Sequence, residues 1–217
     1  MTSGLRLQLE VPCDSFDVAI AWETEQSALG LFGASGAGKS SVLEALAGIR
    51  RGVRGRIEVG VGAGWNRHDH APLGLEFPEI GERADLVEDQ LALLHGLWTE
   101  PDGWSFDGNR VRVEGGFLRP KPVDVPGRPR GTTGAVRPRI IVGGEGSPRG
   151  FRIAARYADE FNLTASSPER AVERFAALDA ACLAAGRDPG TVTHSLMAGT
   201  MIGANAAEVA SRRTELL

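Results

Sequence analysis

PRIIVGGEGSPRGFRIAARYADEFN, residues 138–162, is the stretch of sequence that most directly decides the fold. Residues 139–142 are a short apolar run that is typical of a buried strand. The glycine-rich loop GGEG follows at residues 143–146, and the segment around Phe151 favours a helix. Before the strand, the proline-rich residues 117–137 indicate an irregular loop. A strand, a glycine loop and a helix in this order predict an α/β protein, and backbone amides at such a helix N-terminus can hold a phosphate.

Two longer helices are predicted on either side of this unit. In residues 80–98 apolar side chains recur at intervals of three and four, which places them on one helical face. They are Ile80, Ala84, Val87, Leu91, Leu94 and Trp98. A second helix is expected to begin at Ser166 and Pro168, with Glu169 completing a capping box, and to end at Gly186. Its predicted buried stripe is Val172, Phe175, Leu178 and Cys182.

A second glycine-rich stretch, GASGAGKS at residues 33–40, fits the phosphate-binding P-loop pattern G-x-x-x-x-G-K-S. A P-loop lies between a strand and a helix, and residues 27–32 and 40–47 suit these two elements. The helix would bury the apolar side chains Val42, Leu43 and Leu46. In such a loop Lys39 contacts phosphate and Ser40 ligates Mg²⁺. The pattern therefore predicts a site for ATP with Mg²⁺ at Gly33, Ser35, Gly36, Ala37, Gly38, Lys39, Ser40 and Ser41.

From about residue 60 onward the chain resembles luciferase-like oxidoreductases that use FMN or the deazaflavin coenzyme F-420. The order and spacing of several segments carry the resemblance. They are GVGAGWNRHDH, FPEIGERADLVEDQLALLHGLWTEP, SFDGNRVRVE, LRPKPV, residues 138–162 and SPERAVERFAALDAACLAAGRDP. The resemblance implies an incomplete luciferase-like domain at residues 59–217, with a partial (β/α)₈ TIM barrel. A whole barrel of this kind takes about 250 residues, so we expect the first three strand–helix units and the last strand to be missing.

The same resemblance implies where the cofactor binds. The loop that contains GAGW lines the cofactor pocket in that family, and the GGEG loop suits the cofactor phosphate. The implied cofactor-binding residues are Gly62, Ala63, Gly64, Trp65, Asn66, Gly143, Gly144, Glu145 and Gly146. The alternative for the first loop is a tight strand-to-helix turn with Trp65 in the core. The frequent catalytic histidine of the family belongs to an early barrel strand, so no catalytic residue is assigned.

The beginning of the chain resembles a different family. Residues 1–58, with LRLQLEV, SFDVAIAWE and the P-loop, are similar to the start of an ABC-transporter ATPase of the molybdate-import type. The glutamine loop, signature motif, Asp-Glu strand and switch histidine of that family are not found, so ATP binding is expected but hydrolysis is not. The two resemblances meet at GRIEVG, residues 55–60, which suits a strand of either family. We interpret the chain as a chimera joined at this strand.

Composition limits the remaining function classes. The net charge of −4, from 24 basic and 28 acidic residues, predicts no general attraction to nucleic acid or to anionic membranes. No apolar run approaches the ~18 residues that a membrane span needs, and no signal peptide is visible, so a cytoplasmic protein is expected. Cys13 and Cys182 lack metal-ligand spacing and are interpreted as reduced, structural residues. A metal site at His68, Asp69 and His70 is not favoured, because no further ligand cluster accompanies them.

The sequence therefore predicts a partial flavin- or deazaflavin-dependent oxidoreductase or monooxygenase that acts on a small-molecule substrate. Two alternatives remain: the ATP-binding subunit of an ABC transporter, and a nonfunctional fusion product. An incomplete barrel exposes unpaired strand edges and apolar helix faces, so assembly into a homo-oligomer is also expected.

Overall fold

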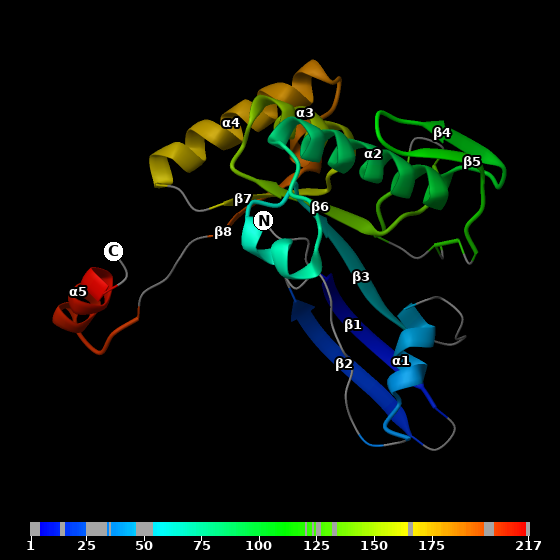
Figure 1. The fold of residues 1–217 in the computed structure, drawn as a ribbon, viewed down its shortest axis with the longest axis horizontal. Helices are drawn as coiled ribbons and strands as arrows, with labels where there is room; N and C mark the ends of the chain where they lie inside the picture. Colours follow the sequence, from blue (N-terminus) through cyan, green and yellow to red (C-terminus); the bar gives the residue numbers. More distant parts are fainter. Residues whose placement is uncertain are drawn as a thin grey trace.

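The structure, a computed structural model, describes residues 5–13, 16–24, 34, 36–46, 54–119, 121–122, 124, 127–131, 134–164, 167–197 and 202–215. Its main feature is a six-stranded sheet of order β2-β1-β3-β6-β7-β8 (Figure 1). The strands are β1 (Leu5–Pro12), β2 (Asp17–Thr24), β3 (Arg54–Val61), β6 (Arg139–Gly144), β7 (Glu160–Thr164) and β8 (Thr193–Met197). β1 is antiparallel to both β2 and β3. β3, β6, β7 and β8 are parallel to one another.

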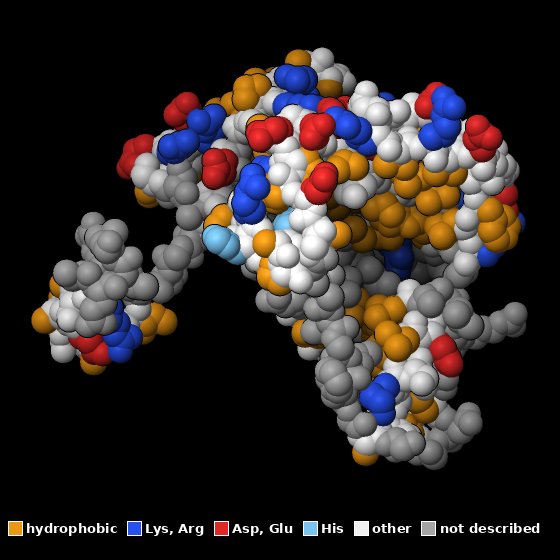
Figure 2. All heavy atoms as spheres, in the orientation of Figure 1, with side chains coloured by type: hydrophobic (Ala, Val, Ile, Leu, Met, Phe, Trp, Pro, Cys, Tyr) orange, Lys and Arg blue, Asp and Glu red, His pale blue; other side chains and the backbone are white. Residues whose placement is uncertain are grey.

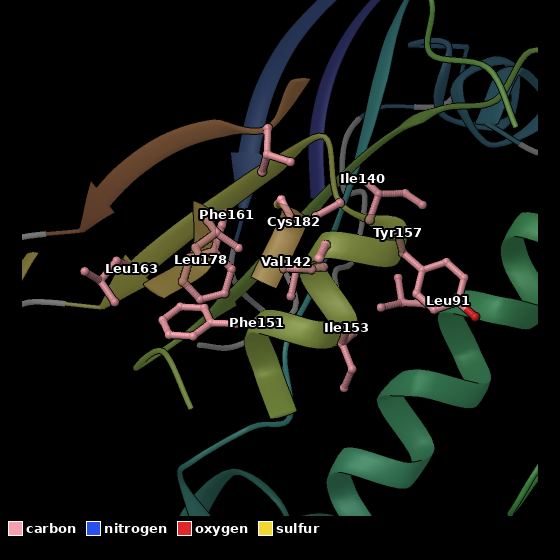
Figure 3. Close-up of a cluster of buried hydrophobic side chains, with 14 of the residues drawn as sticks. Leu91, Ile140, Val142, Phe151, Ile153, Tyr157, Phe161, Leu163, Leu178 and Cys182 are labelled. Atoms are coloured by element: carbon pink, nitrogen blue, oxygen red, sulfur yellow. The ribbon is translucent and has the colours of Figure 1, made fainter. Parts of the chain in front are cut away.

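Three helices cover one face of the parallel strands. They are α2 (Ile80–Thr99), α3 (Pro148–Tyr157) and α4 (Pro168–Ala184). Alternate residues of β6 and β7 point toward these helices, and Figure 3 shows Val142, Phe151 and Phe161 within the resulting core. The Phe151 and Phe161 rings lie 5.4 Å apart. Because the pleat alternates side chains, residues 139, 141, 160 and 162 lie on the opposite face.

A small antiparallel hairpin extends the helical layer. It consists of β4 (Trp104–Asp107) and β5 (Arg112–Gly116). The buried carboxylate of Asp89, on α2, accepts hydrogen bonds from the backbone N–H groups of Arg110 and Val111. These bonds anchor the hairpin to α2.

The remaining elements are shorter or lie apart from this core. Helix α1 (Lys39–Leu46) packs on β1, where Leu9, Val11 and Ala45 form a second, small buried cluster. The 3₁₀ helices η1 (Arg67–Asp69) and η2 (Ala71–Leu73) follow β3, and η3 (Pro189–Thr191) precedes β8. Helix α5 (Ala206–Glu215) lies away from the sheet (Figure 1).

The predicted elements at residues 80–98, 139–142 and 168–186 are confirmed, but some side chains that were predicted to be buried are exposed. Ile80 of α2 is 61% exposed and Val172 of α4 is 71% exposed. In the helix predicted at residues 40–47, Leu43 is 57% exposed. A periodic apolar stripe is buried only where another element lies opposite. Ser167 caps α4 by accepting a hydrogen bond from Arg170 N, so Glu169 does not occupy the capping-box position.

The expected barrel is not observed, because the described strands form an open sheet. The edge of β3 that another parallel barrel strand would occupy is paired with the antiparallel β1. The predicted boundary at residue 59 falls inside β3, whose two edges join β1 and β6 in one sheet. The strand predicted at residues 27–32 lies outside the described residues.

Charged and hydrophobic side chains lie on different parts of the surface. Charged side chains cover the outer sides of α2 and α3, where Arg149 pairs with Asp85 and Glu88 (Figure 2). Figure 2 also shows hydrophobic side chains gathered below α2 and beside the β4–β5 hairpin. Among the described residues, no helix has the length and apolar character needed to cross a bilayer.

Candidate functional site

The two loops predicted to bind the cofactor leave neighbouring strands at the same edge of the sheet. Val61, the last residue of β3, pairs with Val142 of β6, so residues 62–66 and residues 143–146 emerge side by side. In sheets of parallel strands, ligand sites lie at the carboxyl ends of the strands. The structure therefore brings the two predicted groups of residues together where a ligand site is expected.

The first loop is held by the start of α2. Arg83 donates from Nε to the backbone oxygen of Ala63 at 3.0 Å, and its guanidinium lies 3.9 Å from the centre of the Phe77 ring. Gly64 has a φ of 70°, a conformation that favours glycine. Asn66 caps η1 by accepting a hydrogen bond from His68 N. The Trp65 side chain is 69% exposed, so it is not the core residue of the alternative interpretation.

The second loop joins β6 to α3. Ser147 caps α3 by accepting a hydrogen bond from Gly150 N at 3.0 Å. Gly146 has a φ of 81°, and a Cβ built there would lie 2.6 Å from the Phe151 ring. A Cβ built on Gly144 would meet no atom of the described residues within 4 Å. Gly146 is thus required by the local backbone, whereas Gly144 borders open space.

Polar side chains line the sheet face that turns away from the helices. Arg139 of β6 forms ion pairs with Glu58 of β3 at 3.1 Å and with Glu160 of β7 at 2.9 Å. It also donates a hydrogen bond to Thr193 Oγ1 of β8. Arg139, the first residue of β6, therefore connects four parallel strands.

This face continues toward the candidate site through Asn162, which pairs in register with Gly143. Asn162 donates from Nδ2 to Ser195 Oγ at 2.7 Å. Asn162 Oδ1 and Thr164 Oγ1 are buried, with no hydrogen-bond partner among the described residues. Sequence reasoning missed both residues, although the alternation of apolar and polar residues in EFNLT, residues 160–164, could have indicated them.

A hollow of about 380 Å³ lies next to the first loop along the chain. Its lining comes from the segment between β3 and α2, namely Arg67, Ala71, Leu75, Glu76, Phe77 and Pro78. The Arg67 and Arg83 guanidinium groups both contact the Phe77 ring. His70 also contacts this ring edge-on. Within the described residues, no group of three His, Cys, Asp or Glu could hold a metal ion.

The predicted P-loop lies far from these two loops along β3. Helix α1 packs on β1 near Leu9 and Val11, and Leu9 pairs with Gly55 at the start of β3. Gly36 and Gly38 have φ values of 82° and 84°. Gly33 and Ser35 lie outside the described residues. The nucleotide and cofactor sites that the sequence predicts are therefore near opposite ends of one strand.

Comparison with known proteins decides the family. A family model described as luciferase-like monooxygenase matches residues 40–217. The chain belongs to the luciferase-like monooxygenase family. The match begins within α1, upstream of the boundary that we predicted at residue 59. The predicted luciferase-like resemblance is thereby confirmed.

Two curated relatives show the range of this luciferase-like family. The chain is 36% identical over 110 residues to an F420-dependent glucose-6-phosphate dehydrogenase of Nakamurella multipartita, covering 51% of the chain and 28% of the relative. It is 32% identical over 125 residues to an FMNH(2)-dependent dimethylsulfone monooxygenase of Pseudomonas fluorescens, covering 57% and 30%. The matched part thus spans about 30% of the length of these relatives.

Solved structures of other proteins support the fold. EDTA monooxygenase from Chelativorans has a TM-score of 0.54 at 20% identity, with 73% of this chain and 47% of that chain covered. An F420-dependent secondary alcohol dehydrogenase has a TM-score of 0.53 at 24% identity, with 64% and 38% covered. At this level of identity the likeness concerns the fold alone.

Proposed function

We propose that this chain binds FMN or coenzyme F-420 at the carboxyl edge of β3, β6 and β7, as part of an oxidoreductase that acts on a small molecule. The open space at Gly144, beside the start of α3, is the observation that carries this proposal. The two curated relatives add support, because one is an F420-dependent dehydrogenase and the other is an FMNH(2)-dependent monooxygenase.

The residues at this edge fit such a cofactor. A glycine with open space in front of it allows a phosphate to approach the backbone, and the N-terminus of α3 favours negative charge there. The exposed indole of Trp65, in the neighbouring loop, offers a flat apolar surface to a planar ring. The bound cofactor would supply hydride transfer or oxygen activation, while the protein binds and orients it. No side chain is assigned a catalytic role.

Substitution of Gly144 tests the proposal directly. Gly144→Val should fold normally, because a Cβ there meets no atom of the described residues within 4 Å, but its side chain would fill the space that the cofactor phosphate would use. We expect at least a 10-fold loss of affinity for FMN or F-420 in a fluorescence titration. Gly81→Val is the matched control, since a Cβ at that glycine of α2 also meets open space. Unchanged affinity in Gly144→Val, or no binding of either cofactor to the wild type, would contradict the proposal.

We keep ATP binding by residues 1–58 as a second proposal, with residues 59–217 forming the oxidoreductase part. The glycine loop before α1 supports it: Gly36 and Gly38 have positive φ, and Lys39 Nζ donates to Ala34 O at 2.6 Å. Successive amides in such a loop can surround a phosphate. Lys39→Ala should abolish weak Mg-ATP binding in calorimetric titration while leaving FMN affinity unchanged. Sustained ATP hydrolysis by the wild type would contradict the proposal that the site only binds.

We also infer self-association. β8 lies at an edge of the sheet in the described part of the chain, and its Leu196 is 42% exposed. An exposed strand edge with apolar side chains promotes pairing with another chain. Light scattering at micromolar concentration should detect oligomers, and a single monomeric species would contradict this inference.

A further inference from the structure

Two side chains of β7, Asn162 and Thr164, carry buried polar atoms near the candidate site. Asn162 Oδ1 and Thr164 Oγ1 are buried, and neither has a hydrogen-bond partner in the described part of the chain. Both lie on the sheet face opposite the helices, next to the carboxyl ends of β6 and β7. Buried polar atoms are normally paired, and an unpaired one destabilises the free protein. Two such atoms lie on one face, beside the candidate loops, where a bound ligand would supply the missing partners.

The hydrogen bonds of neighbouring residues fix the orientation of the Asn162 amide. Ser195 Oγ donates its single proton to Glu160 Oε1 at 2.6 Å, and Glu160 is an ion-pair partner of Arg139. The Ser195 oxygen can then only accept a hydrogen bond from Asn162, and only the amide nitrogen can donate one. Asn162 Oδ1 is therefore presented as an acceptor. The ligand group that faces it must be an N–H or O–H donor.

We propose that Asn162 Oδ1 and Thr164 Oγ1 form hydrogen bonds with the FMN or F-420 cofactor, with Asn162 accepting from an N–H or O–H group of it. The inference rests on the cofactor function proposed above. Residues two apart on a strand lie about 7 Å from each other, so the pair spans a group the size of one ring. Two parts of the cofactor offer such donors: the imide N–H of its ring and the hydroxyl groups of its side chain. Ser195 acts as a positioning residue.

Isosteric apolar substitutions separate binding from folding. Thr164→Val removes a buried oxygen that has no partner within the described residues, so the melting temperature of the free protein should stay the same or rise. Asn162→Leu also removes the hydrogen bond to Ser195 Oγ, so its melting temperature should fall slightly while the fold is kept. Affinity for FMN should fall about 10-fold, because the cofactor loses its partner. Thr193→Val is the matched control: Thr193 lies on the same face at the other end of β8 and contacts Arg139. That control should leave FMN affinity unchanged.

Fluorescence titrations with riboflavin and lumiflavin distinguish the two donors, since lumiflavin has the ring without the hydroxylated chain. Weaker binding of both ligands by Asn162→Leu assigns the contact to the ring. Weaker binding of riboflavin alone assigns it to the chain. If both variants bind FMN as the wild type does while Gly144→Val does not, the inference is overturned and the cofactor proposal stands. If the wild type binds neither FMN nor F-420, both are overturned.

Discussion

The parallel strands β3, β6, β7 and β8 and the antiparallel pair β1–β2 meet where β1 pairs with β3, yet the two regions are stabilised differently. Helices α2, α3 and α4 bury an extensive apolar cluster against β6 and β7. On β1, by contrast, the buried cluster consists of Leu9, Val11 and Ala45 under the short helix α1. Backbone pairing is extensive in both regions. Because backbone pairing is similar and apolar burial is not, we expect the strands under α2, α3 and α4 to be the more stable region.

Core truncation should give the largest difference between the two regions. Phe161→Ala, in the cluster below α3 and α4, should lower the free energy of unfolding by about 3–5 kcal/mol. Leu9→Ala, in the small cluster, should cost about 2–3 kcal/mol, because fewer buried groups surround the cavity. Urea denaturation followed by circular dichroism measures both. An equal or larger loss in Leu9→Ala would refute the comparison.

The two cysteines report on the two regions separately. Cys182 of α4 is fully buried, and burial raises the pKa of its thiol, whereas Cys13 at the end of β1 is partly exposed. Only the thiolate reacts with an aromatic disulfide, and the helices over the parallel strands must open before a reagent can reach Cys182. Cys13 should therefore react about 100-fold faster than Cys182. Cys13→Ser and Cys182→Ser variants assign the two phases. Similar rates at both positions would mean that the two regions open together.

Substitution of Glu58 tests how strongly β3 is coupled to its parallel neighbour β6. Its buried carboxylate pairs with Arg139 across β3 and β6. Glu58→Gln should lower the free energy of unfolding by about 1–2 kcal/mol, less than for an uncompensated buried charge, because Arg139 keeps Glu160 as a partner. Glu114→Gln on the exposed part of β5 is the control and should change stability by less than about 0.5 kcal/mol. A loss no larger than that of the control would show that the pair does not couple the strands.

The smallest expected effect is a pH dependence of the helical region. Burial first, and then the positive charge of Arg137, lower the pKa of His95 on α2 below its ordinary value of 6.5. The unfolded chain therefore binds this proton at a higher pH than the folded protein. Stability should be unaffected by His95 above about pH 6.5 and should fall as the pH decreases below it. Melting temperatures between pH 5 and 8 should show a shallower acid slope in His95→Gln; an unchanged slope would exclude His95 as the cause.

Local features of the sequence were enough to predict several elements and the glycine-rich loop that follows β6. The intervals of three and four in residues 80–98 and the apolar run at residues 139–142 depend only on helical and strand periodicity. The glycines of the GGEG loop likewise reflect a local requirement, as the positive φ of Gly146 shows. Such features are determined by neighbours in the chain.

Other features depend on which residues meet across long distances. The pairing of β3 with β1, which leaves the sheet open, was not predictable, because GRIEVG at residues 55–60 suits a strand of either family and does not specify which strand lies beside it. The exposure of Ile80 and Val172 follows from what lies opposite each helix, which periodicity does not specify. Asn162 and Thr164 became candidate ligand contacts only when the fold left Asn162 Oδ1 and Thr164 Oγ1 without a partner among the described residues, beside Gly143 and Gly144. Whether a buried polar atom has a partner is decided by the tertiary structure, because the available partners come from other strands.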